Sequence, residues 1–182
     1  MKKFFLFLSG LSIFGFFGCS STHEMVGEPV KQLDLQKYVG HWFEIARFDH
    51  SFERGLVGCM ADYSINDDGT IKVINSGRQR TLSGPYKQKE GKARRPDATQ
   101  PGRLEVSFFL NFYSQYNVLE LADDYRYAMI GSKSDEYLWI LSRTPQMQQA
   151  DIDFLLQSAT RRGYDTSKLI WVEHVIEEPS LN

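Results

Sequence analysis

The sequence predicts an all-β protein, in which the strands form an antiparallel meander and one α-helix follows near the C-terminus. Short alternating or aromatic-rich runs recur from Gly40 onward, which is typical of strands. Turn residues separate these runs at short intervals, and a single segment late in the chain has helical spacing instead. Short connections make neighbouring strands antiparallel, so the meander either closes into a barrel or stacks as a sandwich.

The composition agrees with a folded domain and excludes several classes of protein. The chain has 182 residues, of which 42% are apolar and 24% charged, and this is too apolar for a disordered chain. A net charge of −2 gives no basic field, so we expect no nucleic-acid partner. Two cysteines make no disulfide framework. The four histidines are scattered without the spacing of a metal site, and we expect neither a metal nor a cofactor.

Residues 1–18 have the features of a secretory signal. Lys2 and Lys3 form a positive start, and no charged residue follows from Phe4 to Gly18. This run is shorter than the ~20 residues that a membrane-spanning helix needs. It also has no polar face to show to water, which argues against a helix of the folded domain. We therefore expect residues 1–18 to be removed.

The segment Gly18-Cys19-Ser20-Ser21 resembles the bacterial lipobox. This resemblance implies that Cys19 becomes the mature N-terminus and carries an N-acyl chain and an S-diacylglycerol group. Several acyl chains would hold the protein firmly on a membrane. Ser20 after the cysteine implies sorting to the outer membrane, and we expect its periplasmic face. The alternative is an ordinary secretory cut that leaves Cys19 as a free thiol.

Residues 19–32 are expected to form the lipidated N-terminus and a tether, residues 33–177 the barrel domain, and residues 178–182 a C-terminal tail. Asp68-Gly69, after an alternating run, is a strong hairpin signal. The expected strands are 41–49, 57–66, 70–76, 80–93, 103–110, 115–122, 125–132, 137–143 and 169–175.

One segment predicts a helix of about four turns between the last two strands. Thr144 is the expected N-cap, and Pro145 takes the first helical position. Gly163 is the expected stop, after basic residues in the last turn. The apolar face that this helix would bury consists of Ile152, Leu155, Leu156 and Ala159.

Three short motifs resemble those of the lipocalin family. Gly40-His41-Trp42-Phe43 matches the first signature, Gly-x-Trp followed by an aromatic residue. Asp124-Tyr125 matches the second, and Arg143, at the end of the eighth strand, matches the third. Within the family, the chain is most similar to the apolipoprotein D-like group of bacterial outer-membrane lipoprotein lipocalins. This resemblance implies an eight-stranded antiparallel up-and-down β-barrel, one C-terminal α-helix and a short ninth strand.

The resemblance also implies a structural role for Trp42 and Arg143. Trp42 would plug one end of the barrel, and Arg143 would lie across its ring. A cation–π contact of this kind contributes roughly 0.5–2 kcal/mol. We expect this pair to close the barrel, and we do not expect it to touch ligand.

Strand parity points to a set of inward-facing residues. Trp42, Glu44 and Ala46 share one face of the first strand, so an inward Trp42 brings Glu44 inward. Glu44 could anchor a ligand headgroup, pair with an inward arginine, or satisfy backbone donors near the shut end. The candidate pocket residues are Glu44, Ala46, Tyr63, Phe108, Tyr113, Tyr116 and Trp139.

The one local basic run consists of Lys87, Lys89, Lys92, Arg94 and Arg95. It has two interpretations. It could be the solvated face of a strand pair, where charges discourage edge pairing. It could also attract anionic headgroups or acidic ligands near the mouth of a barrel.

The function that we expect from these observations is binding, and storage or transport, of a hydrophobic ligand in the barrel cavity. A fatty acid or a lysophospholipid would suit the aromatic lining. The protein would reach the membrane through its N-terminal lipid anchor, and a homodimer is compatible with the sequence. The alternatives are a cavity thiol isomerase of lipid-derived substrates that uses Cys59, and a ligand-free structural protein of the envelope. No base or cation can be placed beside Cys59 from the sequence, so we do not expect an enzyme.

Overall fold

A computed structural model describes residues 28–176 of the chain. Within these residues one antiparallel sheet runs in the strand order β2-β3-β4-β5-β6-β7-β8-β1-β9, and a further pairing of β1 with β2 closes it. Strands β1 to β8 therefore form a closed up-and-down barrel, and β9 adds to β1 from outside. This confirms the predicted fold class. The predicted signal segment, Cys19 and the tail lie outside the described residues.

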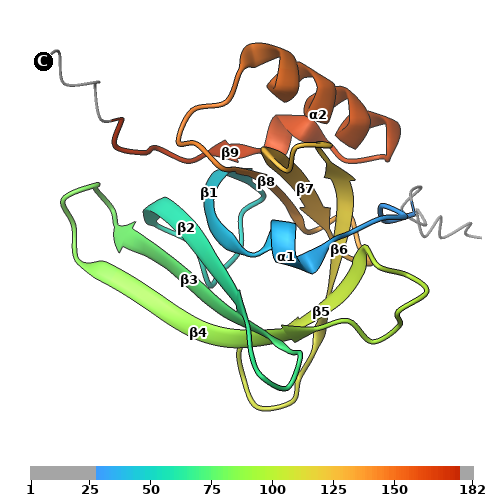
Figure 1. Cartoon of the computed structure of the whole chain (residues 1–182). Helices are drawn as coiled ribbons and strands as arrows, with labels where there is room; N and C mark the ends of the chain where they lie inside the picture. The colour runs from blue at the N-terminus through green and yellow to red at the C-terminus, as the bar shows by residue number, and fades with distance from the viewer. Residues whose placement is uncertain (1–27, 177–182) are drawn as a thin grey trace, which may run out of the picture.

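The first half of the barrel is built from long strands and the second half from shorter ones (Figure 1). The strands are β1 (Gly40–Arg47), β2 (Leu56–Ile65), β3 (Ile71–Gln79), β4 (Tyr86–Arg94), β5 (Arg103–Ser107), β6 (Ser114–Leu121), β7 (Tyr127–Gly131), β8 (Leu138–Ser142) and β9 (Ile170–Trp171). The helices are α1 (Leu35–Tyr38), α2 (Gln149–Arg161) and a 3-10 turn, η1 (Thr166–Lys168). No helix in this part of the chain is long and apolar enough to cross a membrane.

Two hydrophobic clusters hold the fold together. The first fills the closed part of the barrel around Trp42, Leu104 and Ile130. The second lies between the outer wall of the barrel and α2, which packs on the outside of the barrel (Figure 1). Leu155 and Ala159 of α2 are fully buried in this second cluster against Met129 and other outward-facing strand residues. Of the predicted apolar face, Leu155, Leu156 and Ala159 pack in this cluster, and Ile152 is not part of it.

The helix begins later than predicted. Thr144 and Pro145 do not start it, and α2 begins at Gln149, with Gln148 as a cap that makes no side-chain hydrogen bond. The Thr144 hydroxyl instead donates to the Gln146 carbonyl oxygen at 2.6 Å, which stabilises a local turn. The start of α2 is held by Arg126, whose guanidinium donates to both carboxylate oxygens of Asp151 at 2.7 and 2.9 Å.

Several predicted strands are shorter in the structure, and the strand predicted over 103–110 ends at Ser107. Residues 80–85 form a loop, because Arg80 has a left-handed φ of 66° and the Gln79 amide bonds to the Pro85 carbonyl oxygen across the turn. Strand β4 therefore begins at Tyr86. The predicted ninth strand, 169–175, is reduced to the two residues of β9.

The chain before the barrel is more structured than the predicted tether. Val30 lies inside the predicted tether, yet its amide donates to the Val118 carbonyl oxygen at 2.8 Å. Its side chain packs against the first cluster beside Gly102. The short helix α1 was not predicted. Asp34 caps it by accepting a hydrogen bond from the Gln36 amide at 2.9 Å.

Candidate functional site

One end of the barrel is closed by Trp42, Arg143 and α1. Trp42 is fully buried, and the Arg143 guanidinium carbon lies 3.7 Å from its ring centroid. The Trp42 indole Nε1 donates to the Tyr38 carbonyl oxygen at 2.8 Å, which ties the plug to the end of α1. Arg143 also donates to the carbonyl oxygens of Lys37 (2.8 Å), Tyr38 (3.0 Å), Val39 (3.1 Å) and His41 (2.7 Å). A guanidinium suits this place because helix-end carbonyls lack partners and attract a cation.

Above this plug, three tyrosines form a hydrogen-bonded layer. The Tyr116 hydroxyl lies 2.6 Å from the Tyr38 hydroxyl and 3.1 Å from the Tyr63 hydroxyl. The Tyr38 and Tyr63 rings stack, with centroids 5.9 Å apart. Burial raises the pKa of all three phenols above the ordinary value, so the hydroxyls stay neutral and bond to one another. The layer gives the interior an aromatic floor.

A buried cluster of charged side chains lies on the inner side of β1. The Arg47 Nη1 donates to the Glu44 carboxylate at 2.6 Å, and both side chains are buried. The Arg47 Nη2 donates to the carbonyl oxygens of Glu53 at 3.0 Å and Leu56 at 3.1 Å. Glu53 in turn accepts a hydrogen bond from the Trp139 indole at 3.1 Å. The cluster therefore fixes the β1–β2 loop to the barrel wall.

A register shift in β1 explains this cluster and corrects one pocket residue. The pairing of β1 with β8 shifts between Glu44 and Ala46, which is where an extra residue enters the strand. Beyond the shift, Arg47 faces the same side as Glu44, while Ala46 packs in the second cluster against the α2 side. The parity argument that placed Ala46 beside Trp42 is wrong, because it assumed a regular strand.

The electrostatics of the cluster leave Glu44 protonated at neutral pH. Burial, and then the nearby Glu53 carboxylate, raise the pKa of Glu44 to about 8, against the opposing effect of Arg47. Burial, and then the nearby Glu44 side chain, raise the pKa of the Cys59 thiol to about 12. The Arg47 Nη1 lies 3.7 Å from the Cys59 sulfur, but this contact does not offset the burial. Cys59 is therefore a neutral thiol and not an activated nucleophile.

An aromatic group stands where β1 and β8 reach the other end of the barrel. The His50 ring stacks on Phe52 and Tyr137, with centroids 5.2 and 4.9 Å away, and lies 4.7 Å from Trp139. Burial, and then the Arg47 charge, lower the pKa of His50 to about 4, so the ring is neutral. This group walls the mouth on the β8 side.

The opposite wall, formed by β3 and β4, is polar near the mouth. Val73 and Ala93 belong to the first cluster, and alternation along both strands then turns Asn75 and Lys89 to the same inner side. Asn75 and Lys89 are directly paired across the two strands. The Asn75 Oδ1 is buried and has no hydrogen-bond partner among the described residues.

Phe108 crosses this wall over a glycine. A Cβ on Gly91 would lie 2.6 Å from Phe108 Cδ1, so only glycine leaves room for the ring. The Lys89 Nζ lies 5.9 Å from the Phe108 ring centroid. A cation, an aromatic ring and an unpartnered amide oxygen therefore meet at the inner edge of the mouth.

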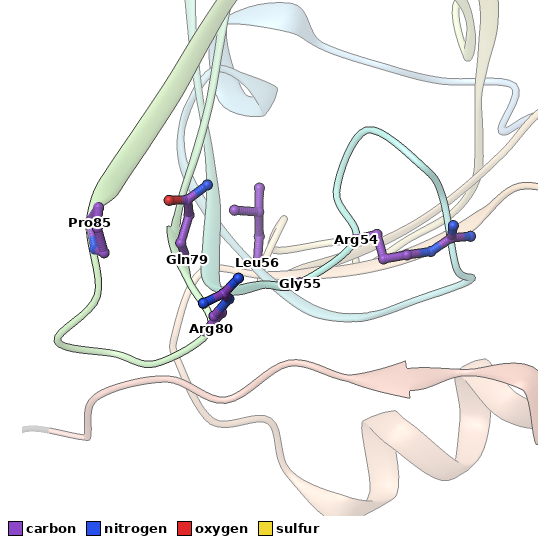
Figure 2. A pocket seen from close by; sticks show the side chains of 6 residues that line it. All are labelled: Arg54, Gly55, Leu56, Gln79, Arg80 and Pro85. Carbon is purple, nitrogen blue, oxygen red and sulfur yellow. The ribbon is translucent and has the colours of Figure 1, made fainter.

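A hollow of about 380 Å³ lies on the rim between the β1–β2 and β3–β4 loops (Figure 2). Its cations differ in their pairing. Arg54 is held by Asp49 through three hydrogen bonds, whereas the Arg80 side chain has no partner among the described residues. The lining residues are Arg54, Gly55, Leu56, Gln79, Arg80 and Pro85.

The predicted pocket residues fall into two groups. Tyr63, Phe108, Tyr116 and Trp139 pack with the barrel cluster, and Glu44 faces the same interior. Tyr113 does not join them, because its ring packs against the Arg94 guanidinium, 4.0 Å away, on the outer face of β4. The sequence reasoning missed Arg47, Glu53 and Asn75. Among residues 28–176 no three His, Cys, Asp or Glu side chains are placed to hold a metal ion.

Known proteins share both the sequence pattern and the fold. A family model described as a lipocalin-like domain matches residues 33–174. The outer membrane lipoprotein Blc of Vibrio cholerae serotype O1 is 41% identical over 174 residues, which cover 95% of this chain and 99% of that protein. The protein of the same name from Escherichia coli K12 is 46% identical over 156 residues, covering 85% and 88%.

More distant relatives extend the comparison to animals. Apolipoprotein D of Rattus norvegicus is 35% identical over 152 residues, which cover 78% of this chain and 77% of that protein. Insecticyanin from the tobacco hornworm Manduca sexta superposes with a TM-score of 0.66 at 22% identity, covering 82% of this chain and 85% of the other. The superposition shows a shared fold.

Proposed function

The chain belongs to the lipocalin family, and on that premise we propose that it carries a single-chain lipid, a fatty acid or a lysophospholipid, in its barrel. One observation supports this above the others. The interior changes from apolar and aromatic at the plugged end to polar at the mouth, as a molecule with an apolar tail and an anionic head requires. The tail would lie among the barrel residues, where burial of apolar surface drives binding by about 25 cal/mol per Å².

The head would bind at Lys87 and Lys89. On the outer face of this wall, Lys72 pairs with Glu90 at 3.1 Å and Arg94 with Glu105 at 2.8 Å. The inward Lys89, and Lys87 two residues before it, have no carboxylate within ion-pair distance among the described residues. An anionic head would supply the missing charge. The Asn75 Oδ1 would accept a hydrogen bond from a glycerol hydroxyl, which a lysophospholipid has and a fatty acid lacks.

The location follows from the predicted anchor. Relatives at 41% and 46% identity are named outer membrane lipoproteins. Together with the lipobox-like segment at Cys19, this supports an acylated protein at the outer membrane, and we propose its periplasmic face. No feature of residues 28–176 argues for catalysis, and the neutral Cys59 thiol argues against the isomerase alternative.

Native mass spectrometry of the protein purified from cell envelopes tests this function. We expect one co-purified lipid per barrel, and extraction should identify it as a fatty acid or a lysophospholipid. An empty barrel whose mass does not shift with either added lipid would contradict the carrier and favour the ligand-free structural protein. The mass of the N-terminal peptide from the same sample reports the acylation of Cys19.

A further inference from the structure

The β5–β6 loop carries the three most exposed large apolar side chains of the described residues. Phe109, Leu110 and Phe112 are 67%, 72% and 73% exposed. The two phenylalanine rings stack on each other, with centroids 6.2 Å apart. No charged residue occurs between Glu105 and Glu120. An exposed apolar group of this kind marks an interaction surface more often than it marks a chance feature of a soluble protein.

The loop has a defined conformation that presents these side chains. The Ser107 hydroxyl lies 3.3 Å from the Phe109 carbonyl oxygen and 3.2 Å from that of Leu110, and can donate to either. The Phe112 amide donates to the Phe109 carbonyl oxygen at 3.2 Å. Leu110 has a left-handed φ of 50°, which is costly for a residue with a side chain. The tight turn directs apolar side chains to solvent. None of these side chains adds to the packing of the second hydrophobic cluster.

Cations surround the base of this tip. Arg94 and Lys92 lie over the Tyr113 ring, at 4.0 and 6.0 Å from its centroid, and Lys89 lies over Phe108. Of these cations only Arg94 has a carboxylate partner within residues 28–176, namely Glu105. The other side of the mouth carries more acidic groups: Asp49, Asp135 and Glu136 line a hollow of about 520 Å³ beside η1, together with Lys168, and Asp49 pairs with Arg54. The rim is therefore apolar and basic on one side and acidic on the other.

We propose that the tip, Phe109 to Phe112, inserts into the surface of an anionic lipid bilayer, with Lys92 and Arg94 against its headgroups. Apolar side chains bury at the boundary of headgroups and acyl chains, and basic residues around them are attracted to anionic lipids. The acidic side of the rim would be repelled, so the barrel would dock tilted, with the β5–β6 side of its mouth on the membrane. This inference goes beyond ligand binding, since it concerns where cargo enters and leaves.

The chain length allows the proposed anchor and the tip to reach one bilayer. Cys19 precedes Glu28 by nine residues, which span at most about 30 Å when extended. Val30 lies beside Gly102, just before β5, and the tip follows the other end of that strand. Five strand residues cover only ~17 Å. An acylated Cys19 therefore leaves the tip free to touch the same surface.

An environment-sensitive label at the tip tests this contact on the mature protein. In the variant Leu110→Cys the new thiol takes a nitrobenzoxadiazole fluorophore, while Cys59 is buried. The matched control is Phe154→Cys, on α2, where the native side chain is 43% exposed. On vesicles of phosphatidylcholine with phosphatidylglycerol, we expect a blue shift and loss of iodide quenching for the label at 110 only. Labels that stay equally exposed to water at both sites would overturn the proposal.

The charge dependence provides a second test. Lys92→Gln should raise the phosphatidylglycerol content needed for a half-maximal blue shift, because each basic residue near a membrane contributes about fivefold to binding. Lys168→Gln, beside the acidic hollow, should leave it unchanged. A blue shift that is equal on pure phosphatidylcholine, or that requires a protein from the envelope in place of vesicles, would refute an anionic bilayer as the partner. Native mass spectrometry reports the cargo separately, so either proposal can fail alone.

Discussion

Arg47 donates a hydrogen bond to the protonated carboxyl group of Glu44 inside the barrel, with 2.6 Å between Nη1 and Oε1 and only 3% and 5% of the two residues exposed. A buried charged or polar pair contributes little to net stability, because both groups lose their hydration. Here the arginine also holds the carbonyl oxygens of Glu53 and Leu56. The pair is best understood as the link that positions the β1–β2 loop at the mouth.

Stability should fall as the pH rises from 6.5 to 8. The pKa of Glu44 is raised by burial to about 8, so the folded chain keeps a proton that the unfolded chain has lost. The stabilisation that Glu44 provides through this retained proton is complete below the unfolded pKa of 4.5, and it is lost as the pH rises through 8. The pKa of His50 is lowered to about 4, and its contribution changes only below its unfolded value of 6.5.

Denaturant unfolding at several pH values measures this slope. Glu44→Gln keeps a neutral group of the same shape and should make the fall in stability between pH 6.5 and 8 shallower. Glu136→Gln, on the exposed β7–β8 loop, is the matched control and should keep the slope of the parent. The role given to Glu44 is wrong if the free energy of unfolding of the parent protein does not change between pH 6.5 and 8.

The Cys59 thiol should be inert in the folded protein. Its pKa of about 12 leaves almost no thiolate at pH 8, and the side chain is buried. Iodoacetamide should modify it only after denaturant is added. Cys59→Ala should retain lipid binding and cost about 1–2 kcal/mol of stability. Fast alkylation of the native protein would contradict this prediction and would favour the alternative function, a thiol isomerase that uses Cys59.

The sequence predicted the parts of the site that local motifs encode. Trp42 and Arg143 were identified from their motifs, and strand alternation predicted the interior side for Tyr63 and Phe108, both of which pack with the barrel cluster. The charged cluster was not predictable, because it depends on an extra residue in β1 that leaves no mark in the alternation. The same shift removed Ala46 from the interior.

The helix start shows a different limit. Thr144 and Pro145 form a good local capping signal, yet the threonine hydroxyl bonds to Gln146 and makes a turn. Packing of Leu155 and Ala159 on the barrel decides which turns of α2 form, and tertiary packing of this kind is absent from a local pattern. The elements were predictable where their own residues specify them, and their ends were not.

Replacing Arg143 should destabilise the closed end even when the charge is kept. A lysine cannot donate to several carbonyls at once or lie flat on the Trp42 ring. We expect both Arg143→Lys and Arg143→Ala to cost about 2–4 kcal/mol in denaturant unfolding. Arg161→Ala, at the exposed end of α2, should cost less than about 0.5 kcal/mol. A lysine variant as stable as the parent would show that only the charge matters.

Lipid binding should depend on the inward lysine and not on its outward neighbour. Lys89→Gln removes the charge that faces the mouth, and we expect about tenfold weaker binding of an anionic single-chain lipid. Lys72→Gln, whose native lysine pairs with Glu90 on the outer face, should bind like the parent. Displacement of a fluorescent fatty acid measures both.

Asn75→Leu separates the two proposed ligands. The leucine removes the buried oxygen at the mouth and leaves Lys89 in place. A lysophospholipid, whose glycerol hydroxyl would donate to that oxygen, should bind several-fold more weakly, since a hydrogen bond contributes about 0.5–1.5 kcal/mol. A fatty acid has no such hydroxyl and should bind as before. Equal losses of affinity for both lipids would mean that Asn75 contributes to the shape of the barrel wall and does not bind the lipid headgroup.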